Sequence, residues 1–458
     1  MKRHVMQKLC KILFFIFVSF HSYADNLLYF LEFPNTAKIQ KNVNIAEFEK
    51  QESWQTQFNL GVCKLFGVGC QINYGEAVML FAKSMYGGSK QSKYAFAICQ
   101  LNGYGIKKNV AEAIKSLDDL DNNDFAPATC ELALCYNEGI GVSQNKDIAK
   151  VMLEKAFAFG SERAGVELAL MRTNNISISN EKEVFDCVKK LALKNNIEAS
   201  YVYAVMLQKG IGANQDIFEA NRLLTFCANN GNANAMYSIG MNYINGVGVV
   251  ADAKKAIEYL KLAGEKSHKV ALNNLAVCYK NGIGVEKNIP IALEYFRKSA
   301  ELGYAVAQNN LAVCYLQGLG GSSVEAFKWL EKSAKGGNID ALFSLAKCYL
   351  DGIGTQKNPR EAVYWLEKSA LKGNVEAKAI LGQILVDGLL VEKNLEDGIA
   401  YLSDASSAGN SDAMLHLGAC YFTGIGIDKN EEYALVLFRK SASMGNKKAI
   451  ETLRKLNK

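Results

Sequence analysis

Proline is scarce in this sequence: only 4 of its 458 residues are prolines, and only 21% of the residues are charged. Disordered chains are rich in both, and this chain is 49% apolar, so its composition excludes disorder and supplies a large core. Histidine is scarce as well, with 4 residues, and no two cysteines have the Cys-x-x-Cys spacing. The sequence therefore predicts no metal site and no cofactor.

The N-terminus has the three parts of an export signal. Basic residues come first, an apolar run at 12–20 follows, and small residues at Ser22 and Ala24 allow cleavage before Asp25. The run is about half of the roughly 20 residues that a membrane-spanning helix needs, and no later stretch approaches that length. We expect residues 1–24 to be a cleaved signal peptide, with no stable membrane insertion afterwards. The protein is then exported, either periplasmic or secreted.

Removal of this segment changes the charge balance. The chain has 52 basic and 46 acidic residues, and four of the basic ones, with no acidic one, lie in the first 24. The mature chain then has a formal charge of +2. A chain so close to neutral gives little support to a nucleic-acid partner, so none is expected.

A short phrase repeats along the chain: LAVCYKNGIG at 275–284 returns as LAVCYLQGLG at 311–320. With the cysteine of this phrase as a register mark, eleven units follow one another at spacings of 34 to 36 residues. The marks are Cys63, Cys99, Cys135, Met171, Met206, Asn242, Cys278, Cys314, Cys348, Ile384 and Cys420. Such a period indicates a repeat array rather than three separate domains.

Each unit predicts two helices. Helix A contains the mark, and in nine units a Gly-x-Gly such as Gly352 and Gly354 stands four and six positions after it. The first glycine suits a left-handed helix cap, and the second allows a sharp turn. Helix B begins at an Asn or Asp cap, most clearly at Asn358-Pro359, and has an alanine at a fixed position that lets neighbouring helices approach closely. The predicted fold is all-α, a string of antiparallel helix pairs.

A typical unit thus has Gly-x-Gly after a tyrosine-bearing helix A, alanine in helix B and a Lys-Ser/Ala-Ala-x-x-Gly ending, and the period is near 36. Together these features resemble the Sel-one-like repeat (SLR) family, a relative of the tetratricopeptide repeat. The resemblance implies a right-handed α-solenoid of about eleven repeats that acts mainly as a protein–protein scaffold. Exported bacterial members of the family take part in envelope processes, signalling and host-cell interaction. The resemblance covers 54–450, which leaves 25–53 as an N-terminal cap segment and 451–458 as a C-terminal capping tail.

Two units depart from the pattern. The fourth has Asn175 and Ser177 in place of the glycines, and the tenth keeps Gly388 but has Leu390 at the second position. We expect a less regular turn in the fourth unit, such as a bend or a joint in the superhelix.

The cysteine column is interpreted as a packing position, because methionine and isoleucine replace cysteine in some units. Successive repeats lie about 10 Å apart, whereas a disulfide needs Cα atoms within about 7 Å, so successive marks should not pair. In a cysteine-rich branch of the similar family, a cysteine late in helix B pairs with one eight positions on, but here Ala235 stands eight positions after Cys227. The sequence leaves open whether disulfides form at Cys63, Cys70, Cys130, Cys187 and Cys227. A bond between Cys63 and Cys70 is one of the options.

A candidate binding groove follows from the tetratricopeptide analogy, in which helix A lines the concave face and the residue five before the mark points into it. In four consecutive units this position offers tyrosine contact area or amides that can bond a peptide backbone. The candidate groove residues are Tyr201, Tyr237, Asn273 and Asn309, with Lys280 and Asn281 at the rim. The alternative is that some of these tyrosines only pack between helices.

The repeat pattern brings no set of titratable residues together, so no catalytic residues and no enzymatic activity are expected. We predict a non-catalytic scaffold that binds a protein or peptide in the concave groove. Ser-x-x-Lys at Ser344 and Ser369 lacks the Ser-Asp-Asn and Lys-Thr-Gly partners of penicillin-recognising enzymes. Two alternatives remain: a β-lactam-binding or -hydrolysing enzyme, as suggested for the cysteine-rich branch, and a cell-wall or polysaccharide assembly scaffold.

Overall fold

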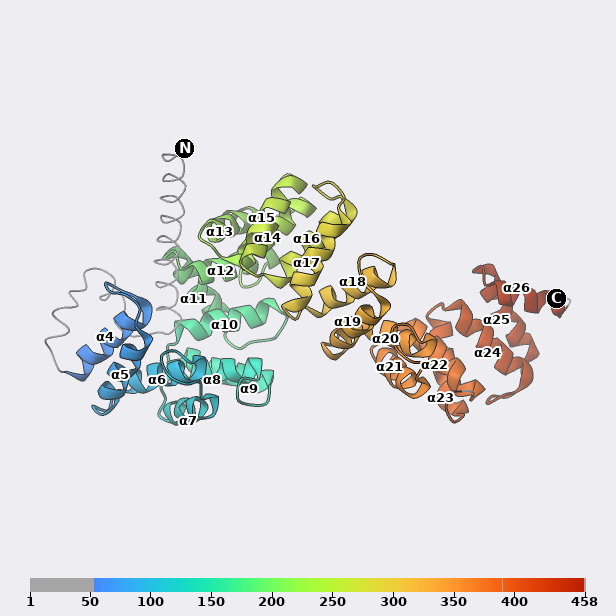
Figure 1. Ribbon diagram of the computed structural model, residues 1–458, viewed down its shortest axis with the longest axis horizontal. Coiled ribbons are helices and arrows are strands. Elements are labelled where there is room, and N and C mark those ends of the chain that lie inside the picture. The colour runs from blue at the N-terminus through green and yellow to red at the C-terminus, as the bar shows by residue number, and fades with distance from the viewer. Residues whose placement is uncertain (1–52, 389, 457–458) are drawn as a thin grey trace. The chain divides into compact units, whose positions relative to one another are not determined.

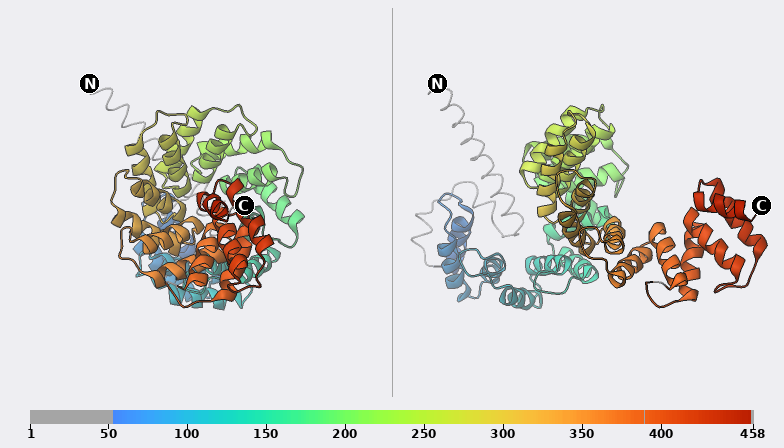
Figure 2. Two further views of the ribbon diagram at one scale, coloured as in Figure 1. Left: turned by 90° about the vertical axis from the view of Figure 1, so that its right-hand side faces the viewer. Right: turned by 45° about the vertical axis from the view of Figure 1, so that its right-hand side comes forward.

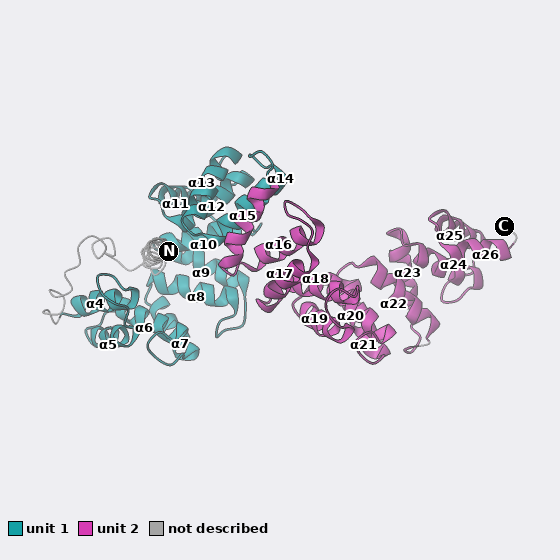
Figure 3. Cartoon of the chain, turned by 45° about the horizontal axis from the view of Figure 1, so that its top comes forward, with its two compact units in different colours: residues 1–252 teal, residues 253–458 magenta. Residues whose placement is uncertain are grey.

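The computed structural model describes residues 53–388 and 390–456, and all regular secondary structure in these residues is α-helical (Figure 1). The predicted signal peptide, 1–24, and the predicted cap segment, 25–53, lie outside the described residues except for Ser53. The chain forms two compact units, Met1–Asp252 and Ala253–Lys458 (Figure 3). The all-α prediction is confirmed.

The first unit alternates helices A and helices B. Its helices A are α4 (Trp54–Phe66), α6 (Lys90–Asn102), α8 (Ala126–Glu138), α10 (Glu162–Thr173), α12 (Ile197–Lys209) and α14 (Ala233–Asn245). Its helices B are α5 (Tyr74–Met85), α7 (Val110–Asp121), α9 (Lys146–Ala158), α11 (Glu181–Leu193) and α13 (Ile217–Asn229). Consecutive helices pack against each other along the chain, and α10 also contacts α12. The helices A of these two successive repeats are therefore neighbours, as a solenoid requires.

The second unit begins with α15 (Ala253–Glu265), the helix B of the sixth repeat, and continues in the same alternation (Figure 2). Its helices A are α16 (Lys269–Asn281), α18 (Ala305–Leu316), α20 (Ile339–Asp351), α22 (Val375–Asp387) and α24 (Ser411–Thr423). Its further helices B are α17 (Ile289–Glu301), α19 (Ser323–Lys335), α21 (Pro359–Leu371), α23 (Leu395–Ser407) and α25 (Glu431–Ser443). A single helix, α26 (Lys447–Lys455), follows the eleventh pair, so the tail expected at 451–458 begins inside a helix.

The predicted caps are present. Helix α20 begins where the Asn338 side chain accepts a hydrogen bond of 2.9 Å from the Ala341 amide. It ends at Gly352, which has φ = 75° and donates its amide to the Cys348 carbonyl. Helix α21 begins at the predicted pair, with Asn358 as cap and Pro359 as first residue. The polar loops between helices thus satisfy the backbone groups that helix ends leave exposed.

The second glycine of the Gly-x-Gly has a role, seen at Gly354 and Gly284, that its spacing alone did not reveal. Gly354 also has a positive φ, 69°, and a Cβ at this position would collide with the Ser323 carbonyl at the start of α19. Gly284 approaches the Ala253 carbonyl in the same way. This glycine therefore lets the loop after helix A touch the start of helix B in the preceding repeat.

A column of serines connects the two helices within a repeat. The Ser299 hydroxyl donates to the Lys269 carbonyl at 2.6 Å, and Ser333 donates to Ala305 at the same distance. In the fifth repeat, the Cys227 thiol takes this place and donates to the Ile197 carbonyl at 3.3 Å. Cys227 is thus a buried substitute for serine, and the Ser-x-x-Lys serine Ser369 belongs to the same structural column.

The register marks form the core, as predicted. The cysteine marks are at most 4% exposed, and the replacements Met171, Met206 and Ile384 are at most 8% exposed. The polar mark Asn242 is buried too, and its amide donates to Asn221 at 2.7 Å and accepts from Gln208 at 3.1 Å. A hydrogen-bonded amide can therefore occupy a position that otherwise takes apolar side chains.

The fourth repeat keeps its helix cap despite the loss of glycine. Asn175 stands at the position of the first glycine and has the same left-handed conformation, with φ = 65°. Asparagine tolerates this conformation better than other residues with a Cβ. The departure comes five residues later, where Asn180 is also left-handed and caps α11 without a side-chain hydrogen bond. The expected irregularity thus lies after the cap rather than at it.

Candidate functional site

The predicted groove residues of the first unit lie between neighbouring helices A. Tyr201 on α12 is half-buried, and its hydroxyl is hydrogen-bonded to Ser238 on α14. Burial raises the pKa of Tyr201, and the bond to Ser238 opposes that rise. Tyr237 on α14 is half-buried as well. The residue five positions before the mark of one repeat thus reaches the residue that stands four positions before the mark of the next repeat.

The same relationship holds in the second unit, where asparagines replace the tyrosines. Asn273 on α16 is only 5% exposed; its oxygen accepts from the Asn310 side chain at 2.9 Å, and its nitrogen donates to Asn274 at 3.2 Å. Asn309 on α18 is 8% exposed, and its side-chain oxygen is buried without a hydrogen-bond partner. Asn273 and Asn309 therefore lie beneath the surface, and Asn273 orients the amides above it.

The residues above Asn273 form a neutral surface that we name the amide face. On α16 the half-buried Asn274 and Val277 share one side with the exposed Asn281, at helical spacings of three and four. The corresponding residues of the next repeat are Asn310 and Val313 on α18 and Gln317, which caps the end of that helix. The bond between Asn273 and Asn310 brings the two helices together at this place. The amide face thus alternates amides that can donate and accept hydrogen bonds with apolar side chains.

The remaining predicted rim residue is placed differently. Lys280 is half-buried on α16 and lies near Cys314, where its charge opposes the rise that burial causes in the pKa of that thiol. Asn281 is the predicted residue that is exposed on the amide face. Asn274 and Asn310 were missed by sequence reasoning, although the dipeptide Asn-Asn at the same register in two successive units was a signal for them.

The corresponding side of the first unit carries charges. Arg163 on α10 forms an ion pair with Glu131 on α8, with 2.7 Å between Nη1 and Oε2, and both side chains are less than 15% exposed. Burial raises the pKa of Glu167 and Glu198, and Glu198 accepts a hydrogen bond of 2.6 Å from Asn232. Sequence reasoning missed this cluster, although Glu131 and Glu167 each stand four residues before a register mark and Arg163 and Glu198 each stand eight residues before one.

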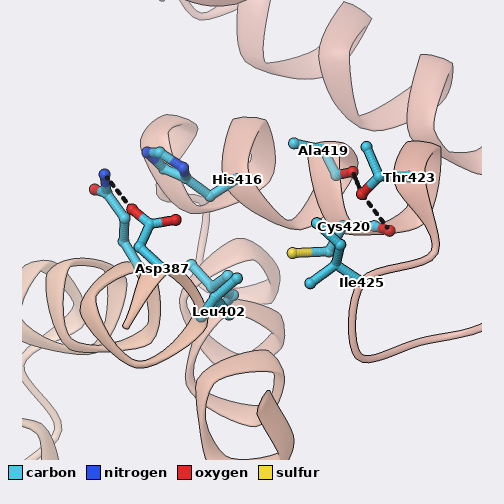
Figure 4. A pocket seen from close by; sticks show the side chains of 9 residues that line it. Asp387, Leu402, His416, Ala419, Cys420, Thr423 and Ile425 are labelled. Atoms are coloured by element: carbon cyan, nitrogen blue, oxygen red, sulfur yellow. Dashed lines mark hydrogen bonds between the residues drawn. The ribbon is translucent and has the colours of Figure 1, made fainter. Parts of the chain in front are cut away.

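A pocket opens between α22 and α24 in the second unit (Figure 4). Its volume is about 130 Å³, and its lining residues are Gln383, Val386, Asp387, Leu402, His416, Ala419, Cys420, Thr423 and Ile425. Asp387 and His416 lie at one end, whereas Thr423 and Ile425 lie at the other. Burial lowers the pKa of His416 and raises that of Cys420. At neutral pH the pocket therefore holds a neutral imidazole and a protonated thiol, beside the side chain of Asp387.

The cysteines are not arranged for nucleophilic chemistry. Burial is the main cause that raises the pKa of Cys63, Cys99 and Cys135 to about 12, which keeps these thiols protonated. Cys70 lies close to Cys63 and donates its thiol to the Cys63 carbonyl at 3.5 Å. Within 53–388 and 390–456, no disulfide joins any of the eleven cysteines.

The described residues contain neither a candidate metal-binding cluster nor a helix suited to span a membrane. No group of three or more His, Cys, Asp or Glu side chains in this part of the chain has an arrangement that could hold a metal ion. None of its helices combines the length and the apolar character that are needed to cross a bilayer.

The helix pairs, the Gly-x-Gly contacts between repeats and the buried register marks define an α-solenoid of short repeats. A family model, the Sel1 repeat, matches ten segments of the chain: 54–89, 91–115, 126–158, 197–232, 233–268, 269–304, 305–338, 339–374, 375–410 and 411–446. The chain belongs to the Sel1 repeat family. The fourth helix pair, α10 and α11, has no match to the model, although it packs like the others.

A solved structure agrees with this fold. The chain is similar to c5321, a protective antigen present in uropathogenic Escherichia coli strains that displays an SLR fold. The identity is 24%, the match covers 89% of this chain and 81% of that chain, and the TM-score is 0.54. A Sel1 repeat protein from Oxalobacter formigenes is 27% identical over 53% of this chain and 96% of that chain, with a TM-score of 0.46. Among curated proteins there is no match.

Sel1 repeat proteins are generally non-catalytic scaffolds, and a repeat scaffold of this kind is compatible with protein–protein interaction. The fold is therefore compatible with a binding function, and a repeat scaffold suggests protein partners.

Proposed function

We propose that this protein is an exported, non-catalytic scaffold that binds a segment of a partner protein on the amide face. The observation that carries the proposal is the position of Asn274 and Asn310, whose side chains Asn273 holds together on neighbouring helices. Held amides lose little freedom when they bond a ligand, so the free-energy cost of binding is small. An extended peptide presents donors and acceptors in alternation, which amides can match.

The apolar residues of the amide face support a peptide rather than a small polar ligand. Val277 and Val313 lie between the amides of α16 and α18 and offer contact to the partner's side chains. Peptide binding by such surfaces combines hydrogen bonds to the main chain with burial of alternate side chains. The predicted residues Tyr201 and Tyr237 in the first unit are proposed to extend the binding surface with aromatic contact area.

The test is selection of linear peptides from a random displayed library against the mature chain, followed by calorimetry with an enriched peptide. The variant Asn281→Ala with Gln317→Ala removes two exposed amides of the amide face, and a second variant, Asn274→Ala with Asn310→Ala, removes the two held ones. Each variant should bind about tenfold more weakly, because two hydrogen bonds contribute about 1 to 2 kcal/mol together.

Gln356→Ala is the matched control, since Gln356 is an exposed amide in a loop of the same unit and lies off the amide face. It should bind like the original protein. A peptide that binds both double variants as tightly as the original protein places the binding surface elsewhere and contradicts the proposal. Covalent labelling of the folded chain by a fluorescent penicillin would contradict its non-catalytic part.

The export signal supports an envelope or extracellular setting, and with it a role in envelope signalling or host interaction. Basic residues, a short apolar run and Ser22-Tyr23-Ala24 stand in the order that signal peptidases recognise. Cell fractionation with N-terminal sequencing tests this part: the mature protein should begin at Asp25 and be absent from the cytoplasm. A chain that keeps Met1 and stays in the cytoplasm contradicts it.

A further inference from the structure

We propose that the pocket between α22 and α24 binds a basic side chain, lysine or arginine, of the partner protein. The inference rests on the proposed function for the source of this side chain, because Gln383 and Asp387 lie on the same positions of helix A as Val277 and Asn281 of the amide face. It goes further than that function, since it assigns a chemical preference to one place on the chain.

The charge at one end of the pocket points to a cation. Asp387 is exposed, and its only hydrogen-bond partner among the described side chains is the Gln383 amide, at 3.4 Å. Asp404 on α23, by contrast, lies 3.1 Å from the Lys378 ammonium. Asp387 therefore presents a carboxylate that no lysine or arginine of the described chain neutralises. An anionic ligand would be repelled from this end of the pocket.

The other groups at this end are acceptors as well. Gln383 uses its amide nitrogen on Asp387, which leaves its oxygen as an acceptor. His416 lies beside Asp387 in Figure 4, and because burial keeps it neutral, it offers one ring nitrogen as an acceptor. A carboxylate, an amide oxygen and an imidazole together match a group with several N–H donors, such as an ammonium or a guanidinium.

The rest of the pocket is mainly apolar and suits an aliphatic stem; its one hydroxyl, on Thr423, donates to the Ala419 carbonyl at 2.8 Å. Leu402 is fully buried, Val386 and Cys420 are less than 10% exposed, and Ile425 stands at the end opposite Asp387. Lysine and arginine side chains lie with their methylene groups on apolar surface and their charge in a polar place. A volume of about 130 Å³ holds one such side chain rather than a folded element of a partner. The pocket thus combines an apolar floor with a charged end, as an amphipathic cation requires.

The experiment uses the mature chain with 13C-labelled isoleucine, leucine and valine methyl groups and small probes of known chemistry. Nα-acetyl-lysine methylamide and its arginine analogue should shift the methyl signals of Ile425, Leu402 and Val386 in a saturable way. The norleucine analogue has the same stem without the charge and should cause at least tenfold weaker binding, if any. Equal binding of all three probes, or no shift with either basic probe, overturns the proposal.

The variant Asp387→Asn keeps the shape of the pocket and removes its charge. It should weaken binding of the basic probes about tenfold or more, whereas Asp351→Asn should leave it unchanged. Asp351 is the matched control, because it is an exposed aspartate at the same position of the preceding helix A. Binding that persists in Asp387→Asn overturns the proposal, and thermal melting of the variant checks that its fold is intact.

The result for the pocket can be distinguished from the result for the proposed scaffold function. Loss of peptide binding in the amide-face variants, together with absent probe binding, would leave the scaffold function supported and remove the pocket. Probe binding at Ile425 without any selected peptide would keep the pocket and contradict the scaffold function.

Discussion

The Ser333 hydroxyl donates a hydrogen bond of 2.6 Å to the Ala305 carbonyl and thereby connects α19 to the first turn of α18. Ser333 is fully buried, so water cannot replace it as a donor to this carbonyl. Substitution Ser333→Ala should lower the free energy of unfolding by about 1 kcal/mol, the usual net contribution of such a bond. Thermal and urea unfolding monitored by circular dichroism measure the change.

Ser369→Ala is the matched control for this prediction. Ser369 occupies the same structural column and is equally buried, but its hydroxyl has no hydrogen-bond partner. Its replacement removes an unsatisfied buried group and should leave stability unchanged or raise it by about 1 kcal/mol. A Ser369→Ala variant that loses as much stability as Ser333→Ala would show that packing, not the hydrogen bond, accounts for the serine column.

Gly354 and Gly337 provide a second comparison. Both have a positive φ, 69° and 83°, so alanine at either position should cost about 1 to 2 kcal/mol in conformational energy. Only Gly354 also faces a backbone group, the Ser323 carbonyl, whereas nothing lies within 4 Å of a Cβ at Gly337. Gly354→Ala should therefore lower the melting temperature clearly more than Gly337→Ala. Equal losses would mean that the contact between repeats relaxes without cost.

His268 predicts a dependence of stability on pH. Its Nδ1 accepts the Ala271 amide at 3.0 Å as the cap of α16, and burial lowers its pKa below the usual 6.5. The unfolded chain then takes up a proton at a higher pH than the folded chain does. Stability is complete above pH 6.5 and is lost as the pH falls from there through the lowered folded-state pKa.

His268→Asn should remove this part of the acid sensitivity and keep the cap, because asparagine caps five of the other ten helices A. His268→Ala should cost about 1 kcal/mol at pH 8 through loss of the cap. Melting curves between pH 5 and pH 8 measure both effects. Some acid sensitivity will remain from His416, whose pKa burial also lowers, with Lys448 acting in the same direction and Asp387 and Asp412 against it. An unchanged pH profile in His268→Asn would contradict the prediction.

Thiol labelling tests the interpretation of the cysteine column. Cys70 and Cys187 are half-buried, whereas the other nine described cysteines are buried. Burial also raises the pKa of Cys227 to about 12 and that of Cys348 to about 11, so few thiolates exist at pH 8. A maleimide should label Cys70 and Cys187 first and the remaining cysteines only after denaturation. Cysteines that react only after addition of a reductant would instead indicate disulfides.

The fold was predictable because its signals are local. The spacing of the marks, the asparagine caps and the Gly-x-Gly pairs each specify a helix end within one repeat, and together they predict eleven helix pairs. The fourth pair was harder, since Asn175 replaces the glycine that marks the cap elsewhere.

The candidate site was less predictable, because it depends on how neighbouring helices A are rotated about their axes. A rotation of one residue decides whether Asn273 or Asn274 reaches the surface, and spacing along the chain does not record it. The pocket at Asp387 could not be predicted either. Its lining comes from three helices and a loop. Gln383 and Ala419 stand 36 residues apart, as do Asp387 and Thr423, but the side chains at these equivalent positions differ in chemistry.

The glycine contact described above joins each repeat only to the one before it, and the serine bond stays within a single repeat. Almost every stabilising contact of this kind therefore links residues close in sequence. Chains with such low contact order fold quickly, and an array can begin to fold at any repeat and extend in both directions. A chain that crosses a membrane unfolded would need no distant segment to arrive before its first repeats take shape.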